Sequence, residues 1–197
     1  MKFLPTTKEE MKSLGWDSID VLLISGDTYL DTSYNGSALV GKWLVEHGFK
    51  VGIIAQPEVD VPDDITRLGE PNLFFAISGG CVDSMVANYT ATKKRRQQDD
   101  FTPGGENNKR PDRAVLVYSN MIRRFFKGTT KKIVISGIES SLRRITHYDY
   151  WTNKLRKPIL FDAKADILSY GMGEMSMLQL ANALKNGEDW QNIRGLC

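Results

Sequence analysis

The sequence predicts an α/β fold: a doubly wound, mostly parallel sheet of five or six strands, Rossmann-like or flavodoxin-like. Two observations predict it. Short apolar runs rich in β-branched and aromatic residues, typical of strands buried on both faces, alternate with segments of helical spacing. Four of these runs also end in a small, glycine-bearing step, at residues 21–26, 73–80, 133–137 and 167–173.

The first part of the chain predicts a strand–helix–strand unit. A short polar helix at 6–18, capped by Thr7 with Glu10 three residues later, precedes it. The unit consists, in order, of a strand at 19–25, a loop at 27–36, a helix at 37–47 and a strand at 49–55. Its length is that of a right-handed parallel crossover.

The rest of the chain continues the alternation with one interruption. The expected elements are, in order, a short helix from Pro62, a strand at 73–78, helices at 82–90 and 111–127, strands at 132–136 and 166–170, and a helix at 174–186. Residues 91–112 break the pattern as an inserted loop, of a length typical of functional or mobile loops. Residues 139–163 are less regular, and we expect a short strand at 158–161.

Composition excludes several classes of protein. The 197 residues, 41% hydrophobic and 25% charged, are typical of one soluble globular domain, so we expect a single α/β domain over 1–197. A net charge of +2 gives no argument for nucleic acid or a membrane. No apolar run could span a bilayer, and two distant cysteines predict a reducing, cytoplasmic compartment. Residues 192–197 lead toward a further element, so we expect a fragment of a longer protein.

The glycine-bearing strand exits predict a ligand site. In a parallel sheet the carboxyl ends of the strands meet at one edge, where ligands bind, and glycine admits a positive φ or a close ligand. The exit residues expected to bind are Gly26, Asp27, Ser78, Gly79, Gly80, Gly137, Gly171 and Gly173. Residues 78–80 would cradle a phosphate at a helix N-terminus. A tight strand-to-helix turn explains them equally well, because a Walker lysine and a GxGxxG fingerprint are missing.

Residues 139–151 hold the densest set of reactive side chains and directly follow a strand exit. Arginines can hold a carboxylate or phosphate, histidine can transfer a proton, and aromatic rings can stack on a ligand. The expected binding residues are Asp83, Glu139, Arg143, Arg144, His147, Tyr148, Tyr150 and Glu174. An ion-paired cover packed on the sheet is the equal alternative, and Glu174 also fits a first-turn helix charge.

Three further signals have simpler readings. The basic run at 93–96 fits a solvated helix end better than a nucleic-acid contact, because Asp99 and Asp100 follow it. Cys81 lies near a helix start that could lower its thiol pKa, although a buried cysteine is the favoured interpretation. No spacing of metal ligands occurs, so we expect no metal site in this chain, and we assign no catalytic residue.

Several motifs occur together in a fixed order: F-L-P-T-T at 3–7, G-I-I-A-Q-P at 52–57, V-D-S-M-V-A-N-Y-T at 82–90, T-P-G-G at 102–105, K-R-P-D-R-A at 109–114, S-S-L-R-R at 140–144, H-Y-D-Y-W at 147–151, K-A-D at 164–166 and Y-G-M-G-E at 170–174. By these motifs the chain resembles, over essentially its whole length, the N-terminal region of the YgiQ-type radical SAM protein family. The number of ordered matches makes this resemblance specific.

The resemblance implies a cobalamin-binding-domain-like fold ahead of a radical SAM core. That core would hold a [4Fe-4S] cluster on a CxxxCxxC motif and cleave S-adenosylmethionine to a 5′-deoxyadenosyl radical. Neither cofactor is expected within this chain, which would be inactive alone. We do not expect cobalamin either, because the D-x-H-x-x-G loop of cobalamin domains reads D-T-Y-L-D-T at 27–32, with Tyr29 in place of the histidine.

Three functions follow as hypotheses. The leading one is an accessory domain that covers the core's active site and contributes to binding a cofactor or an unidentified small-molecule or macromolecular substrate. The second is a stand-alone module that binds a nucleotide or phosphorylated metabolite. The third is an RNA-contacting domain of a modification enzyme, using residues 93–96 with Lys109, Arg110 and Arg113.

Overall fold

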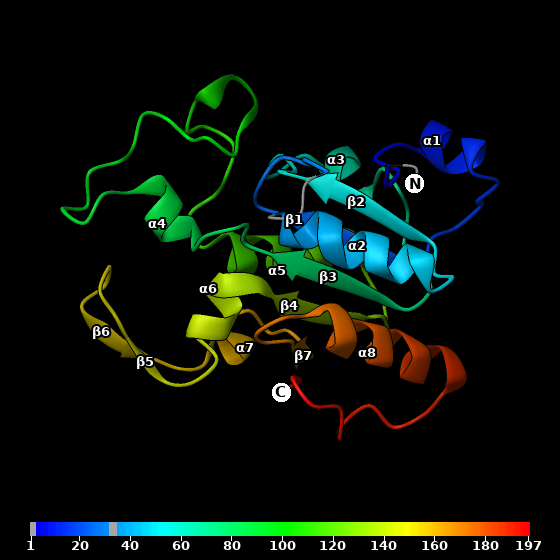
Figure 1. Ribbon diagram of the computed structural model, residues 1–197. Helices are drawn as coiled ribbons and strands as arrows, with labels where there is room; N and C mark the ends of the chain where they lie inside the picture. The colour runs from blue at the N-terminus through cyan, green and yellow to red at the C-terminus, as the bar shows by residue number, and fades with distance from the viewer. Residues whose placement is uncertain (1–2, 32–34) are drawn as a thin grey trace.

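The computed structural model describes residues 3–31 and 35–197 and confirms the predicted α/β architecture. Five parallel strands form one sheet in the order β2-β1-β3-β4-β7 (Figure 1). The strands are β1 Val21–Ser25, β2 Val51–Ala55, β3 Phe74–Ser78, β4 Lys132–Ser136 and β7 Ile167–Leu168. From β1 the chain adds β2 on one side, and β3, β4 and β7 then follow on the other side. This is the strand order of flavodoxin-like doubly wound folds, which bind ligands at the switch point between β1 and β3.

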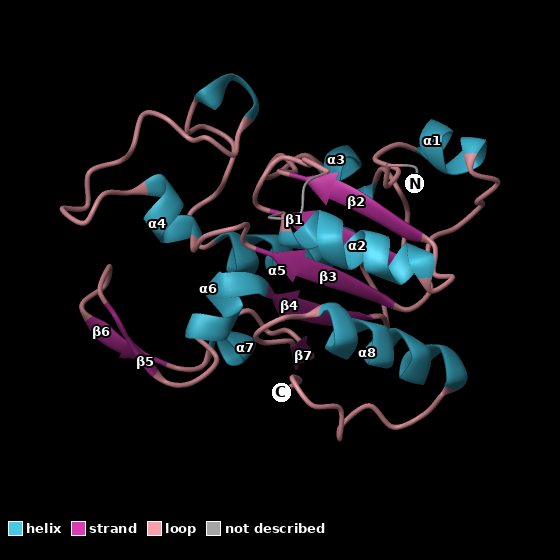
Figure 2. Cartoon of the chain, viewed as in Figure 1, coloured by secondary structure: helices cyan, strands magenta, loops and turns pink. Residues whose placement is uncertain are grey.

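Helices cover both faces of the sheet. The helices α2 Gly36–Glu46 and α8 Glu174–Asn186 lie side by side on one face, as Figure 2 shows. The helices α3 Pro62–Thr66 and α5 Ala114–Phe125 pack together on the other. Two apolar clusters result, one on each face. This double burial explains why the strands are continuous apolar runs instead of alternating ones.

The predicted N-terminal helix is confirmed as α1 Lys8–Ser13. Thr7 caps it, and its side chain accepts a hydrogen bond from Glu10 N while the Glu10 side chain bonds back to the cap. This capping box is the feature that marked the helix in the sequence. Within the described ranges, none of the helices has the length and apolar character that a membrane crossing requires.

The predicted strand at 158–161 is wrong, because these residues begin the helix α7 Ile159–Asp162. Pro158 has a φ of −49° and stands at the N-cap, a terminal position where its missing N–H costs nothing. Ile159 N donates to Arg143 O at 2.9 Å, which fixes the start of the helix. Before α7, the irregular region forms α6 Gly137–Leu142 and a hairpin of β5 His147–Asp149 and β6 Lys154–Arg156.

Residues 91–112 form an extended arm beyond the carboxyl ends of the strands (Figure 1). The arm follows the short helix α4 Ser84–Asn88 and contains one 3-10 turn, η1 Pro103–Gly105. Isolated bridges pair Tyr89 with Arg95 and Gln98 with Glu106. The loop expected at 27–36 extends from β1 to α2, and its residues 32–34 lie outside the described part of the chain.

Candidate functional site

Three neighbouring strands end in serine at the same level of the sheet. Ser25, Ser78 and Ser136 are direct partners in the parallel register. Their hydroxyl groups bond to the backbone near the strand ends: Ser25 Oγ accepts from Asp27 N at 3.1 Å, and Ser136 Oγ donates to Ile77 O at 3.2 Å. Small side chains at this edge leave space above the sheet.

A cavity of about 300 Å³ opens at this edge, bordered by the first turns of α2 and α8. Leu23, Ala76, Val40 and Met177 give it an apolar side, and the serine row gives it a polar side. Its acidic lining residues are Asp27 and Glu174, and no lysine, arginine or histidine lines it among the residues that the structure describes. The site is therefore suited to an uncharged or cationic group more than to a phosphate.

Predicted site residues contribute a large part of this lining: Asp27, Ser78, Gly80, Gly137, Gly171, Gly173 and Glu174. They come from the exits of β1, β3, β4 and β7, which meet at one edge because the strands are parallel. Gly80, Gly137 and Gly171 have φ values of 116°, 81° and 74°, which glycine adopts without strain. Ligand binding by these residues stays a prediction.

Gly26 and Gly79 lie behind the lining and are packed against other parts of the chain. A side-chain carbon on Gly26 would collide with the Gly79 carbonyl group, and one on Gly79 with the Glu139 carboxylate. Gly26 N also donates to Ser78 O at 2.9 Å. These two glycines are therefore explained by close packing of the strand exits, with no need of a ligand.

The first turn of α2 also lines the cavity, although none of its residues was among the predicted site residues. Asn35 caps the helix by accepting from Ala38 N at 3.1 Å, and both Asn35 and Ser37 line the cavity. This helix follows β1 in the chain, so it begins near the carboxyl end of that strand. The expectation that ligands bind at the carboxyl ends of parallel strands therefore applies to its first turn as well. Cys81 and Met172 also line the cavity and adjoin predicted strand exits, but neither was among the predicted binding residues. Met177, one turn into α8, carried no such signal.

A second group of predicted site residues fixes the starts of α4 and α5 and does not line the cavity. Asp83 Oδ1 accepts from Met85 N at 2.9 Å at the start of α4 and forms an ion pair with Arg143. Burial lowers the pKa of Arg143. Glu139 is 2% exposed, and its Oε2 accepts from Ser84 N at 3.0 Å. Burial raises the pKa of Glu139, against hydrogen bonds from Ser84 and the Val115 backbone that lower it.

Glu139→Gln tests this assignment through pH. The pKa of Glu139 is raised above its usual 4.5 in the folded chain, so ionisation of this carboxyl group favours the unfolded chain. The folded chain therefore has its full stability below pH 4.5 and loses part of it as the pH rises. The glutamine retains an acceptor for Ser84 N and cannot ionise. We expect the stability of the variant relative to the wild type to increase between pH 4.5 and 7, measured by urea unfolding. Glu46→Gln, on the exposed end of α2, is the control and should show no such trend; a flat difference for Glu139→Gln contradicts the assignment.

The third group of predicted site residues extends from the end of α6 through the hairpin, apart from the cavity lining. His147 Nδ1 lies 3.1 Å from Ile145 O. Tyr148 OH donates to Asn153 Oδ1 at 2.6 Å, and Tyr150 OH donates to Ala91 O at 2.7 Å. The Arg144 guanidinium lies over the Tyr170 ring, 5.4 Å from its centroid. The structure thus does not bring Arg144, His147, Tyr148 and Tyr150 into the cavity with the strand exits.

One buried ion pair attaches the hairpin to α5. Arg113 Nη2 donates to Asp149 Oδ2 at 2.7 Å, and the Asp149 side chain is 1% exposed. Burial alone would raise the pKa of Asp149, but hydrogen bonds from Thr152 and Arg113 outweigh it and lower the pKa to about 2. This pair therefore stabilises the fold above pH 4 and is lost only in strong acid.

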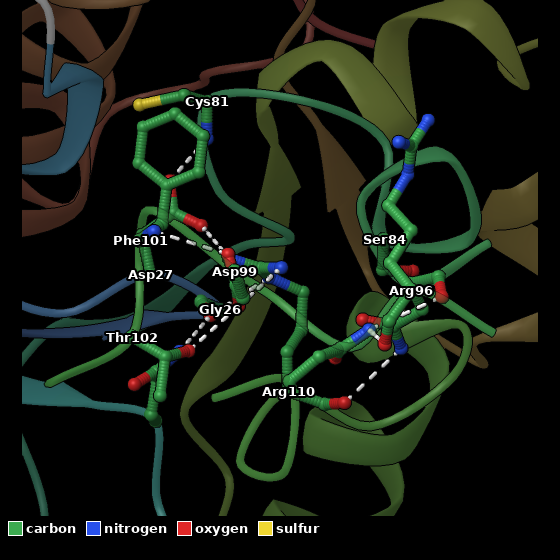
Figure 3. A network of polar contacts seen from close by, with 12 residues as sticks. Gly26, Asp27, Cys81, Ser84, Arg96, Asp99, Phe101, Thr102 and Arg110 are labelled. Atoms are coloured by element: carbon green, nitrogen blue, oxygen red, sulfur yellow. Dashed lines mark hydrogen bonds and ion pairs between the residues drawn. The ribbon is translucent and has the colours of Figure 1, made fainter. Parts of the chain in front are cut away.

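A buried polar network attaches the arm to the end of β1 (Figure 3). The Arg110 side chain, 0% exposed, forms ion pairs with Asp27 at 2.5 Å and Asp99 at 2.9 Å, and its Nε donates to Gly26 O at 3.0 Å. Thr102 Oγ1 donates to Asp99 Oδ2 at 2.6 Å. The cavity residue Asp27 is thus held by the arm.

The network rules out two alternatives that the sequence left open. Arg110 cannot contact RNA, as the third hypothesis supposed, because its guanidinium is buried between two carboxylates. The less favoured alternative for Cys81, a lowered thiol pKa, is contradicted as well, because burial, a hydrogen bond to Asp27 and the charge of Asp27 raise the thiol pKa to about 12. Across residues 3–31 and 35–197, no group of three or more histidine, cysteine, aspartate or glutamate side chains could hold a metal ion.

Comparisons with known proteins agree with this architecture. Residues 3–197 match the family described as Radical SAM N-terminal. A UPF0313 protein of Fusobacterium nucleatum subsp. nucleatum is 97% identical over 197 residues, all of this chain and 35% of that protein. A UPF0313 protein of Thermotoga maritima is 54% identical over 98% of this chain and 34% of that protein, and one of Methanocaldococcus jannaschii is 53% identical over 97% and 31%. The chain spans about a third of the length of these relatives.

Among solved structures, the chain is similar to TsrM, a radical S-adenosylmethionine methyltransferase from Kitasatospora setae solved with cobalamin and a [4Fe-4S] cluster bound. The TM-score is 0.57 with 17% sequence identity, covering 91% of this chain and 27% of that chain. At this level of identity the likeness supports the fold.

Proposed function

Because the chain belongs to the radical SAM N-terminal family, we propose that it is the N-terminal accessory domain of a radical SAM enzyme. It covers the active site of a core domain in the same polypeptide and contributes a cavity for a substrate or cofactor. The relatives, about three times as long as this chain, have room for such a core.

The [4Fe-4S] cluster and S-adenosylmethionine belong to that core. Together they supply reductive cleavage of S-adenosylmethionine when bound. This chain has two cysteines, Cys81 and Cys197, and a CxxxCxxC site needs three thiolates. The role of the chain's own residues is to bind and orient a ligand and to exclude water from it.

The observation that carries the proposal is an exposed apolar border at the mouth of the cavity. Met172 and Ile138 line the cavity and are 85% and 49% exposed. Leu142, four residues after Ile138 on α6, and Met175 are exposed next to them in the chain. Gly171 N donates to Ser141 Oγ at 3.3 Å, so α6 and the turn before α8 adjoin. Exposed apolar side chains gathered around a cavity are typical of a surface that another protein surface covers.

The charge of the cavity favours this function over the stand-alone module. A nucleotide or phosphorylated metabolite needs cations or free helix N-termini for its phosphate groups. The described lining has no cationic side chain. Of the two helix N-termini at the cavity, that of α2 is capped by Asn35, and that of α8 carries the Glu174 carboxylate in its first turn. Serine hydroxyls and apolar side chains suit an uncharged heterocycle instead.

The loop after β1, residues 27–36, contains no histidine, the residue that the motif of cobalamin domains offers to cobalt. Tyr29, in the position of the histidine of cobalamin domains, accepts a hydrogen bond from Leu4 N on its hydroxyl at 3.0 Å and does not line the cavity. Thr32, in the position of the motif's glycine, lies outside the described residues. We therefore propose no coordination of cobalamin by this loop.

Cysteine labelling of the full-length protein tests the covered mouth. We expect Met172→Cys to react with a maleimide at least about tenfold more slowly than Asn186→Cys, because the core would shield the mouth. Asn186 is exposed at the opposite end of α8 and is the matched control. Peptide mass spectrometry measures the two rates. Equal rates would show that the mouth is open and that the chain does not cover a core.

A further inference from the structure

Two segments far apart in the sequence form one surface beside the cavity edge. They are residues 89–96, at the start of the arm, and residues 143–157, which include the hairpin; we call them together the arm–hairpin surface. The Tyr89 and Trp151 ring centroids lie 5.3 Å apart, and Tyr150 OH donates to Ala91 O at 2.7 Å. Figure 1 shows both segments projecting beyond the carboxyl ends of the strands.

This surface concentrates positive charge. The two segments contain nine lysine and arginine residues and one acidic residue, whereas the whole chain has 26 basic and 24 acidic residues. The acidic residue, Asp149, is buried and paired with Arg113. The rest of the chain is therefore net acidic, and the basic surface is local.

Several of these cations are exposed and available to a partner. Arg143 and Arg156 form ion pairs with Asp83 and Asp162. Exposed basic residues of the surface that form no ion pair within the described part of the chain include Lys93, Lys94, Arg144, Lys154 and Lys157. Their side chains can bind a polyanion without first breaking an internal ion pair.

Exposed aromatic rings lie among these cations. Tyr148 and Tyr150 are 58% and 48% exposed, and Leu155, the partner of Tyr148 across the hairpin, is 77% exposed. Lys93 Nζ lies 4.6 Å from the centroid of the Tyr150 ring, and Trp151 packs edge-on against that ring. A two-stranded hairpin whose rings face water gains stability from a partner that covers them.

We propose that the arm–hairpin surface binds single-stranded nucleic acid. Lysines bind the phosphate backbone, and exposed rings stack on bases of any sequence; the two features together are typical of single-strand binding. An anionic membrane also attracts lysines and aromatic rings. Proteins usually bind such a membrane through an amphipathic helix, whereas this surface is built from a loop and a hairpin. The inference rests on the proposed function, since it assigns the substrate class of the accessory domain.

Fluorescence anisotropy with the full-length protein tests the proposal. The probes are a labelled 20-nucleotide RNA and a DNA of the same sequence, each titrated between 50 and 200 mM salt. We expect Lys94→Ala/Lys154→Ala/Lys157→Ala to weaken binding at least tenfold at low salt and to reduce the slope of log K against log salt by about 2. Lys8→Ala/Lys12→Ala/Lys127→Ala, three exposed lysines outside the surface, is the matched control and should leave both quantities unchanged.

Tyr148→Ala separates stacking from charge. We expect a loss of about fivefold to a hundredfold with no change in the salt slope. Equal affinities for RNA and DNA would indicate that the surface contacts the phosphate backbone and the bases. Tighter binding of RNA would indicate a further contact to the 2′-hydroxyl group, and both results agree with the proposal.

Three results would overturn it: no binding below micromolar concentrations, equal loss in the surface and control triple variants, or binding to vesicles of phosphatidylcholine and phosphatidylserine in place of nucleic acid. The labelling of Met172→Cys on the same preparation tests the covered mouth separately. Failure of that assay with nucleic-acid binding intact would remove the accessory-domain function and leave the binding surface.

Discussion

Arg110→Met is expected to lower the free energy of unfolding by about 3–5 kcal/mol, because it leaves two carboxylates buried without their cation. Arg110, Asp27 and Asp99 have side chains at most 2% exposed, so water cannot replace the lost ion pairs. Methionine keeps much of the volume of the arginine stem, which confines the effect to charge and hydrogen bonding. Urea unfolding at pH 7 measures the loss.

Arg124→Met is the control for this experiment. Arg124 also pairs with an aspartate, Asp60, but the two side chains are 62% and 69% exposed. Its loss should cost less than about 1 kcal/mol, since exposed ion pairs contribute little. A loss in Arg110→Met as small as in the control would mean that the network does not attach the arm.

Adding Asp99→Asn to Arg110→Met sharpens the test. The asparagine is neutral and still accepts from Thr102, whose Oγ1 lies 2.6 Å from Asp99 Oδ2. We expect the double variant to recover part of the lost stability, because one uncompensated charge is removed. Such a non-additive result is typical of residues within one network. Hydrogen exchange at Thr28 N, which donates to Phe101 O at 2.9 Å, should meanwhile speed up in Arg110→Met.

The network also shows what the sequence could not predict. Arg110 and Asp27 are 83 residues apart, and no local pattern distinguishes an arginine that pairs with a distant aspartate from one in a solvated run. Its charge alone made Arg110 a candidate RNA contact under the third hypothesis. By contrast, the strands and their exits were predictable, because burial on both faces gives a continuous apolar run and a positive φ favours glycine, and both patterns are visible within a few residues.

The hairpin was not predicted from the sequence, for a different reason. β5 and β6 are three residues each, too short for an alternating pattern, and Tyr148 and Leu155 face outward where strand patterns expect polar residues. Pro158 is equally compatible with a strand end and a helix start, and only the bond from Ile159 N to Arg143 O decides between them. The class of the sheet, doubly wound and mostly parallel, was predictable from the sequence, and the position of the arm and hairpin was not.

Gly26→Ala is expected to destabilise the fold by about 1–3 kcal/mol, as overpacking of a close contact does. The added carbon would collide with the Gly79 carbonyl group, and backbone cannot rotate away as a side chain can. Gly26 N also donates to Ser78 O at 2.9 Å, so separating the exits of β1 and β3 breaks a hydrogen bond. Thermal unfolding should show a fall in Tm of several degrees.

Gly36→Ala is the matched control, because Gly36 also lines the cavity and a carbon added there meets nothing within 4 Å. Gly36 is the first residue of α2, where alanine is the better helix former, so the control should be as stable as the wild type or more stable. If Gly26→Ala kept its stability as well, the exits of β1 and β3 would be able to move apart. The cavity would then lack a rigid floor, and binding of a ligand there would need an ordering step that a preformed site avoids.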